Sequence, residues 1–393
     1  MTAITNLILF ALGLPATAAT LYLLLFTLLS RAPPAALRSS RRLRFDVVVP
    51  AHDEAAAIQG VVANLRKLDW PADSFRVLVV ADNCTDSTAA LARKAGAEVL
   101  ERNDTTRRGK GYALAFAFHT SQAHGWADAV VVVDADTEVS ANLLEAFAGR
   151  IDDGAKAIQA YYGVLNPQAS WRTRLMAIAM AAFHRVRSRA RERLQLSCGI
   201  RGNGWCVTHR LLHQVPYRAF SLTEDVEYGI DLGLAGHRVH YADEACVAGM
   251  MVSGEAAART QRQRWEGGRL RLIRTRILPL LRAARDPDGG GVCLDLALDL
   301  LMPPLSYVAV NVAALMVLAV IALLWEPFAQ MWLWLGLVCG LVLLLYVLRG
   351  WQLSGVGIRG LVDLARAPFF VLWKVLLMLR ARAPAAWVRT KRE

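Results

Sequence analysis

The sequence lacks the short motifs of several common enzyme classes. It has no GxSxG of hydrolases, no GxGxxG loop in a strand-to-helix turn and no HExxH zinc motif. Its six cysteines form no CxxC pair and show no zinc-ligand spacing, so neither a zinc site nor a disulfide framework is predicted. Internal repeats and low-complexity tracts are also absent. Catalysis, if present, must therefore use carboxylates and cations placed by the fold.

Long apolar runs are present, and they are confined to the two ends of the chain. Hydrophobic residues make up 55% of the sequence and the mean hydropathy is +0.32, but the excess lies in Met1–Leu29 and after Val292. The first run is long enough to span a bilayer. A cleaved signal peptide is the alternative, but no basic region precedes the run and the run continues past any small-residue cleavage site. An uncleaved membrane anchor is therefore predicted.

Acidic residues are fewer than basic ones, at 33 against 45, which gives a net charge of +12. Nucleic-acid binding is one interpretation of this charge. The cations cluster beside the apolar runs, however, so an anionic membrane surface is the simpler partner, and no nucleic-acid partner is expected. Basic residues beside spans stay in the cytoplasm, which predicts an integral protein of the bacterial inner membrane with a cytoplasmic middle domain and tail. These cations are Arg31, Arg38, Arg41, Arg42 and Arg44, and Arg380, Arg382, Arg389, Lys391 and Arg392.

The composition divides the chain into segments. A transmembrane helix (1–30) and a basic linker (31–44) precede a cytoplasmic domain. After the domain we expect an amphipathic helix on the membrane surface, two transmembrane helices and an interfacial or re-entrant segment that ends in a basic tail. The domain covers 45–276, and the later segments cover 277–292, 293–349, 350–379 and 380–393.

Apolar strands alternate with helical segments in the middle domain. This pattern predicts an α/β fold with a mostly parallel sheet and helices on both faces. Ligands of such sheets lie at the carboxyl ends of the strands. Asp82 and Asp134 both come directly after an apolar strand, so they are expected at that edge. The predicted strands are Phe45–Pro50, Phe75–Ala81, Glu98–Glu101 and Ala129–Val133, and a long basic helix is predicted over Arg172–Leu196.

Four groups near this edge are candidates for a donor site. Asp134 and Asp136 flank one residue and can hold a hard divalent cation against a diphosphate. Asp82 can accept hydrogen bonds from a base or ribose. The loop that carries Asp53 and Glu54 can line a nucleoside pocket, and Lys110 opens a glycine-rich helix start that can meet a phosphate. The alternatives are helix caps and Asx turns for the acids and a solvated loop for the lysine.

Two later groups are candidates for catalysis and acceptor binding. A carboxylate in Thr223-Glu224-Asp225 can take a proton from an attacking hydroxyl, although the same residues also suit a helix N-terminus. Gln261, Arg264 and Trp265 fall on one face of a helix, where they can bond hydroxyls, pair with a diphosphate and stack on a sugar ring. A basic helix that touches lipid headgroups is the alternative for this second group.

Taken together, PAHDE, VVADN, DAD, TED and QRQRW resemble the family 2 membrane glycosyltransferases, the group that includes cellulose, chitin and hyaluronan synthases. In size and layout the chain is also similar to the ceramide glucosyltransferases. The resemblance covers about Phe45–Arg276. It implies a GT-A fold, a nucleoside-diphosphate sugar donor such as a UDP-sugar, Mg²⁺ or Mn²⁺, and inversion at the anomeric carbon.

The resemblance also implies individual roles. Asp225 would be the general base, Asp134 and Asp136 would hold the metal and diphosphate, and Asp82 would contact the nucleoside together with Asp53 and Glu54. Lys110 would be a further donor contact. The acceptor and the diphosphate would be held by Thr223, Glu224, Gln261, Arg264 and Trp265.

Three functions stay open at this point. The first is synthesis of a polysaccharide or oligosaccharide, which TED and QxxRW favour. The second is transfer of one or a few sugars to a membrane lipid, because about three spans are fewer than a polymer-secreting synthase uses. A homodimer or a membrane partner is expected to supply the missing spans in the first case. The third is a non-catalytic membrane scaffold, against which the intact acids argue.

Overall fold

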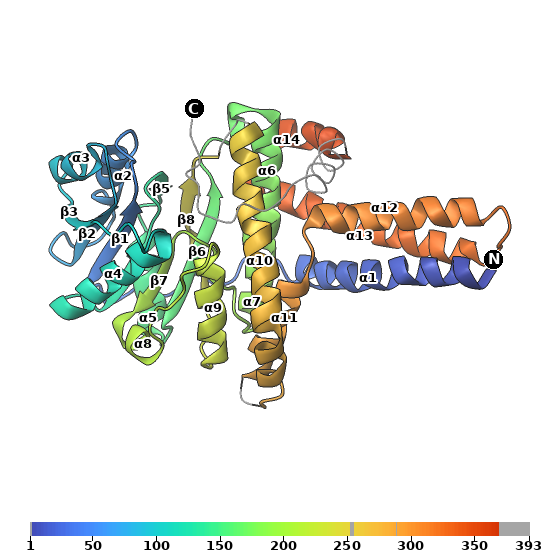
Figure 1. Cartoon of the computed structure of the whole chain (residues 1–393), viewed down its shortest axis with the longest axis horizontal. Helices are drawn as coiled ribbons and strands as arrows, with labels where there is room; N and C mark the ends of the chain where they lie inside the picture. The colour runs from blue at the N-terminus through green and yellow to red at the C-terminus, as the bar shows by residue number, and fades with distance from the viewer. Residues whose placement is uncertain (1, 252–254, 288, 369–393) are drawn as a thin grey trace.

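The structure is a computed structural model of the chain. It describes residues 2–251, 255–287 and 289–368, and within 255–266 it describes the backbone alone. Three bodies follow one another along the long axis of Figure 1: a sheet domain, a layer of long helices that stand across it, and a bundle of apolar helices.

The sheet has eight strands in the order β3-β2-β1-β4-β7-β6-β8-β5. Strands β3, β2, β1 and β4 are parallel, and β6 pairs in parallel with β8, whereas β7 runs antiparallel to β4 and β6 and β5 runs antiparallel to β8. The predicted mostly parallel sheet is therefore confirmed. The strands are β1 (Phe45–Ala51), β2 (Phe75–Asp82), β3 (Glu98–Arg102), β4 (Ala129–Val132), β5 (Thr137–Val139), β6 (Ala157–Val164), β7 (Trp205–Thr208) and β8 (His240–Gly249).

Helices cover both faces of the sheet, as predicted. Alternate residues of β1 point to opposite sides, so Val47 and Val49 enter one core and Val48 enters the other. The first core is closed by α2 (Ile58–Leu65), α3 (Thr88–Lys94) and α5 (Leu143–Asp152). The second is closed by α4 (Lys110–His124), α8 (His209–Gln214) and α9 (Glu224–Leu234). Because the parallel strands run in the same direction, their carboxyl ends lie at one edge of the sheet, which the helices on the two faces leave open.

The layer between sheet and bundle differs from the prediction in two places. The long helix predicted over Arg172–Leu196 is α6 (Trp171–Ala181), a π-helical turn (Ala182–Val186) and α7 (Arg187–Arg193). The surface helix expected to begin at residue 277 is the end of α10 (Glu255–Ala283), which contains Pro279 without breaking there. A short helix with two aspartates, α11 (Gly290–Leu301), follows and precedes the membrane segments.

Three described helices are long and apolar enough to cross a membrane: α1 (Thr2–Leu28), α12 (Leu305–Ala322) and α13 (Ala329–Ser354). They pack side by side and point away from the sheet (Figure 1). Helix α13 continues past residue 349, where the transmembrane segments were expected to end, and it stops before Gly355, which has the left-handed conformation common at helix ends. A short α14 (Gly357–Asp363) follows, and residues 369–393 lie outside the described part.

Buried ion pairs hold the helices of this layer together, and a hydrogen bond links the layer to the apolar bundle. Arg191 of α7 is fully buried and pairs with Asp295 at 2.6 Å and with Asp299 at 2.8 Å, both on α11. Its guanidinium also donates to the Tyr22 hydroxyl on α1 at 2.5 Å. A buried charge costs stability unless it is paired and hydrogen-bonded, so these three partners explain how the charged Arg191 side chain is tolerated in the buried layer. The arginines of the predicted basic helix therefore pair with acids far along the chain.

Candidate active site

One cavity of about 1880 Å³ joins the carboxyl edge of the sheet to the apolar bundle. Its polar end is lined by most of the residues that the sequence predicts to belong to the functional site. Asp82 comes from β2, Asp136 from the loop after β4, and Asp225 from the first turn of α9. The sequence-predicted residues on the wall are Glu54, Asp82, Lys110, Asp134, Asp136, Thr223, Glu224 and Asp225.

Asp82 is held at the rim by an arginine. Its carboxylate accepts a hydrogen bond from Arg102 Nη1 at 2.6 Å and one from Asn83 Nδ2 at 3.0 Å. The His52 ring lies 2.7 Å from the Asp82 carbonyl oxygen through Nδ1, which links the loops after β1 and β2. Asn83 has a φ of 52°, a conformation that asparagine tolerates better than most residues. These hydrogen bonds therefore fix the Asp82 carboxylate in place.

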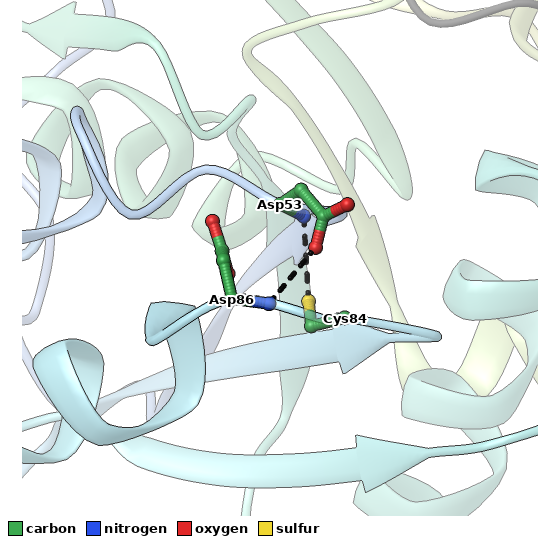
Figure 2. Close-up of side chains that lie close together, drawn as sticks. All are labelled: Asp53, Cys84 and Asp86. Atoms are coloured by element: carbon green, nitrogen blue, oxygen red, sulfur yellow. Dashed lines mark hydrogen bonds between the residues drawn. The ribbon is translucent and has the colours of Figure 1, made fainter.

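Asp53 lies beside the cavity and ties two loops together (Figure 2). Its carboxylate accepts hydrogen bonds from the Thr85 backbone at 2.7 Å and from the Asp86 backbone at 3.3 Å. The bond from the Thr85 backbone is the main reason that the pKa of Asp53 is lowered. Asp53, Cys84 and Asp86 are close enough together to form a possible metal cluster. The hydrogen bonds to the loops explain this arrangement without an ion, and burial raises the pKa of the Cys84 thiol, which disfavours the metal-binding thiolate.

Lys110 lies between Asp134 of the predicted donor site and Glu224 of the predicted catalytic group. Its Nζ lies 2.5 Å from Asp134 Oδ1 and 3.9 Å from Glu224 Oε1, and it donates to the Gly202 carbonyl at 2.6 Å. Gly109, with a φ of 123°, allows the chain to turn into α4 at this point. Burial opposes the charge on Lys110, but Asp134 and Glu224 outweigh it and raise the lysine pKa. A permanent cation thus lies between the two acidic groups.

Asn203 holds the start of the loop that carries Asp134 and Asp136, which is called the DxD loop below. Its side-chain oxygen accepts from the Asp134 backbone N–H at 3.0 Å, and its amide donates to Thr137 Oγ1 at 2.7 Å. Asn203 is itself fully buried, so this support is rigid. Asp134 and Asp136 both line the cavity as hard oxygen donors. Their chemistry fits Mg²⁺ or Mn²⁺, which take carboxylate ligands together with diphosphate oxygens.

Glu224 and Asp225 form a proton-binding pair at the start of α9. Burial raises the pKa of Glu224 to about 7, with Asp225 adding to the rise and Lys110 opposing it. Burial also raises the pKa of Asp225, against the opposing charge of Lys110. Asp225 Oδ2 lies over Gly202, where an added methyl carbon would come within 3.3 Å of it.

This pair predicts an acid limb in the pH dependence of activity. The base, expected to be Asp225, must be unprotonated, and burial raises the pKa of this carboxyl, so we expect kcat/KM to fall on the acid side at a pH above the ordinary carboxyl range. Glu224→Gln is expected to move this limb to lower pH, because the amide removes a neighbouring negative charge. A profile over roughly pH 5 to pH 9 in both proteins measures it. A wild-type limb near pH 4, the ordinary carboxyl range, would contradict the assignment.

Gln261, Arg264 and Trp265 lie on α10, but their side chains fall outside the described part of the structure. The next turn of the same helix reaches the site. Gly268 packs so tightly on Thr223 that an added methyl carbon would come 2.4 Å from Thr223 Cγ2. Thr223, Glu224 and Asp225 do lie at a helix N-terminus, as the alternative interpretation supposed. Thr223 is buried, however, and its hydroxyl makes no hydrogen bond within the described residues, so its side chain does not cap α9. Contact with α10 instead positions the loop.

A comparison with protein families fits this geometry. Residues 43–268 match the family model described as glycosyltransferase like family 2. The chain belongs to this family. Among curated relatives, the beta-monoglucosyldiacylglycerol synthase of Synechocystis is 29% identical over 238 residues, which cover 58% of this chain and 48% of the relative. The probable glycosyltransferase YdaM of Bacillus subtilis is 23% identical over 57% of this chain and 55% of its own length. The chain thus spans about half the length of these relatives.

Among solved structures, the mannosyltransferase PcManGT of Pyrobaculum calidifontis, in complex with GDP-Man and Mn²⁺, superposes with a TM-score of 0.54. It is 19% identical, and the match covers 88% of this chain and 98% of that one. At this identity the likeness concerns the fold alone. It confirms the predicted GT-A-type domain of this family 2 member.

The close contact between Gly268 and Thr223 predicts that a substitution of Gly268 strongly lowers kcat. Gly268→Ala is expected to lower kcat by about tenfold or more, because its methyl group would push Thr223 and with it the Glu224–Asp225 pair. Steady-state kinetics measures it. Gly60→Ala on α2, where an added methyl carbon meets nothing within 4 Å, is the matched control with unchanged kcat. Unchanged kcat in both variants would show that this contact does not position the pair.

Sequence reasoning missed several residues of the site. Arg102 holds Asp82, and Arg201, Gly202 and Asn203 form a loop under Asp134 and Asp225. The glycines of GIRGNG, Gly199–Gly204, indicate a loop but assign it no role. Its signal was the density of glycine, since Gly199, Gly202 and Gly204 all have positive φ.

Proposed function

We propose that the protein is a membrane-bound inverting glycosyltransferase that moves a sugar from a nucleoside-diphosphate donor to a lipid acceptor. The observation that carries this proposal is the extent of the cavity. The same cavity that holds Asp134, Asp136 and Asp225 continues between the apolar helices. A lipid can therefore bring its headgroup to the acids while its chains stay among apolar side chains.

The apolar arm of the cavity is built from three elements. Helix α12 contributes Ala313 and Val317, α13 contributes Leu344 and Val347, and α6 contributes Ile178. Two of these helices are long and apolar enough to cross a membrane. An apolar arm of this kind suits acyl or prenyl chains, whereas a sugar polymer needs hydroxyl-binding side chains along its path. This contrast favours the lipid acceptor over the polysaccharide or oligosaccharide.

The acids supply the chemistry of transfer. Asp225 takes the proton from the acceptor hydroxyl as that oxygen forms a bond to the anomeric carbon on the face opposite the diphosphate. The bond from the anomeric carbon to the diphosphate oxygen breaks, and the electron pair leaves with the nucleoside diphosphate. Attack from the opposite face inverts the anomeric centre. Lys110 lies beside Asp134, so its positive charge can stabilise the negative charge that develops on the leaving diphosphate.

Asp134 and Asp136 are the residues that would hold a divalent cation, Mg²⁺ or Mn²⁺. When bound, the cation neutralises charge on the diphosphate. Asp82, Glu54 and Asp53 would hold the nucleoside end, with a UDP-sugar as the expected donor. Thr223, Glu224, Gln261, Arg264 and Trp265 would surround the acceptor and the diphosphate.

Two further points support the membrane lipid. The Synechocystis relative is named for a product built on diacylglycerol. Three apolar helices long enough to cross a bilayer support a membrane location, and the cations beside them favour, under the positive-inside rule, a sheet domain on the cytoplasmic side of a bacterial inner membrane.

The proposal is tested by filling the apolar arm. Ala313→Trp places a large ring in the cavity, whereas Val320→Trp adds the same ring to an exposed position of α12 that does not line the cavity. Nucleotide release is measured with UDP- and GDP-sugars, a divalent metal and membrane lipid. We expect Ala313→Trp to lose lipid-dependent release and Val320→Trp to retain it. Equal release from both variants would remove the lipid from this arm.

A further inference from the structure

The middle of the cavity contains a cluster of buried arginines that the transfer mechanism does not use. Arg187 and Arg201 both line the cavity wall, and each is more than nine-tenths buried. Both pair with Asp299 of α11, Arg187 at 3.4 Å and Arg201 at 3.0 Å. Arg187 also donates to the Tyr346 hydroxyl of α13 at 3.0 Å. The cluster therefore lies where the catalytic end meets the apolar arm.

This cluster carries more positive than negative charge. Among the described residues, the ion pairs of Arg187, Arg191 and Arg201 are made to two carboxylates, those of Asp295 and Asp299, and Asp299 pairs with all three guanidinium groups. Asp225 also interacts electrostatically with Arg201, at longer range. Of the three arginines, Arg191 does not line the cavity. A buried positive charge without its own counter-ion is costly, and a ligand anion would relieve that cost.

Two further groups on the wall have unused hydrogen-bonding capacity. His184 Nδ1 and Ser306 Oγ are buried and have no hydrogen-bond partner within the described residues, yet both side chains line the cavity. His184 sits in the π-helical turn one helical turn before Arg187. Burial, reinforced by Arg201 and Arg187, lowers the pKa of His184 to about 3, so the ring is neutral and one nitrogen can donate. Unsatisfied buried groups of this kind call for a partner.

The cluster also lies next to Asp225, the proposed general base. Arg201 directly precedes Gly202, and Asp225 Oδ2 lies over Gly202, within 3.3 Å of an added methyl carbon. A group bound by Arg201 would thus be a near neighbour of the hydroxyl that Asp225 deprotonates. On the membrane side, the Tyr346 hydroxyl contacts Arg187, and Tyr346 packs with Val186 in the apolar cluster of the bundle.

We propose that Arg187 and Arg201, with His184 and Ser306, bind the acid headgroup of an anionic lipid acceptor. Arginine presents a planar fork of donors that matches phosphate and carboxylate oxygens. The acid group rests against the arginines, an adjacent hydroxyl reaches Asp225, and the chains follow the apolar arm. This inference rests on the proposed function and narrows its acceptor from any lipid to one that carries a negative charge.

The test is lipid binding to the full-length protein in detergent, without donor, so that no turnover is needed. Short-chain phosphatidylglycerol and the matching neutral diacylglycerol are titrated while thermal stability and intrinsic fluorescence are followed. We expect the anionic lipid to bind about tenfold more tightly, the size expected of a charged hydrogen-bonded contact. Equal affinity for the two lipids would overturn the inference and leave the proposed function standing. Absence of binding by either lipid would overturn both.

Variants separate recognition from folding. Arg201→Gln is expected to abolish the preference for the anionic lipid. His184→Phe is the milder variant, because it keeps an aromatic ring, slightly larger than imidazole, against Tyr162 and Phe183 while it removes the ring nitrogens. It is expected to reduce the preference about threefold or more. Arg191→Lys, in the same ion cluster but off the cavity wall, is the control that keeps the preference. An unchanged preference in a folded His184→Phe and a folded Arg201→Gln protein would contradict the assignment.

A final arm identifies the source of the anion. Inorganic phosphate and UDP are each added before the lipid. We expect the lipid to bind equally well in the presence of UDP, because the donor diphosphate belongs at Asp134 and Asp136. Competition between UDP and the lipid would assign the arginines to the donor instead, and inorganic phosphate that matched the lipid in affinity would assign them to a free anion. Either result would contradict the inference.

Discussion

Asp225→Asn is expected to abolish sugar transfer while donor binding persists. The amide keeps the shape of the side chain at the start of α9 but cannot accept the proton of the acceptor hydroxyl. Removal of a general base costs about 10²–10⁴ in rate. Nucleotide release measures the loss, and calorimetric titration with the nucleoside diphosphate and metal measures the retained binding.

The control for this variant lies on the same helix. Asp231→Asn changes a carboxylate of α9 that pairs with Arg276 at 3.1 Å and does not line the cavity. We expect it to retain most of the wild-type rate. Wild-type turnover in Asp225→Asn would show that another group takes the proton, with Glu224 as the first candidate because it shares the buried pair.

Asp136→Ala is expected to remove the metal dependence of donor binding. The variant deletes one of the two carboxylates that flank Ala135 on the cavity wall, and the remaining Asp134 is already paired with Lys110. Loss of one charged ligand is expected to weaken metal-supported donor binding by about tenfold to a hundredfold. Titration of UDP with and without Mn²⁺ measures it.

The second acidic cluster provides the matched control. Asp86→Asn alters the group of Asp53, Cys84 and Asp86, whose oxygens bond to the loop backbone. We expect this variant to lose stability and to keep the metal dependence of UDP binding. If Asp86→Asn lost that dependence and Asp136→Ala kept it, the metal would belong to the loop cluster and the DxD assignment would be wrong.

The sheet and its functional edge were predictable because their signals are local. Runs such as FDVVVP and FRVLVVA identify buried strands. A polar residue directly after a buried strand of a parallel sheet lies at the carboxyl edge of that sheet. Asp82 and Asp134 therefore reached the cavity as expected. The helix through Pro279 was not predictable in the same way, since proline ordinarily ends a helix.

The remaining features depend on contacts between distant residues. Composition shows that Arg187, Arg191 and Arg201 are basic, but their partners on α11 lie about a hundred residues further along the chain. No spacing rule relates such positions, and a basic helix in isolation looks like a membrane-surface helix. The union of the polar site with an apolar arm likewise exists only after α6, α12 and α13 pack together.

The most direct test of the account is the fate of the transferred sugar. Wild-type protein in lipid vesicles is supplied with radiolabelled UDP- and GDP-sugars and a divalent metal, and the products are partitioned between organic solvent and water and then sized by mass spectrometry. The account predicts an organic-extractable lipid that is heavier by one or a few sugars. A ladder of water-soluble or high-mass products would contradict it and would point to polymer synthesis, with a second chain completing the exit path.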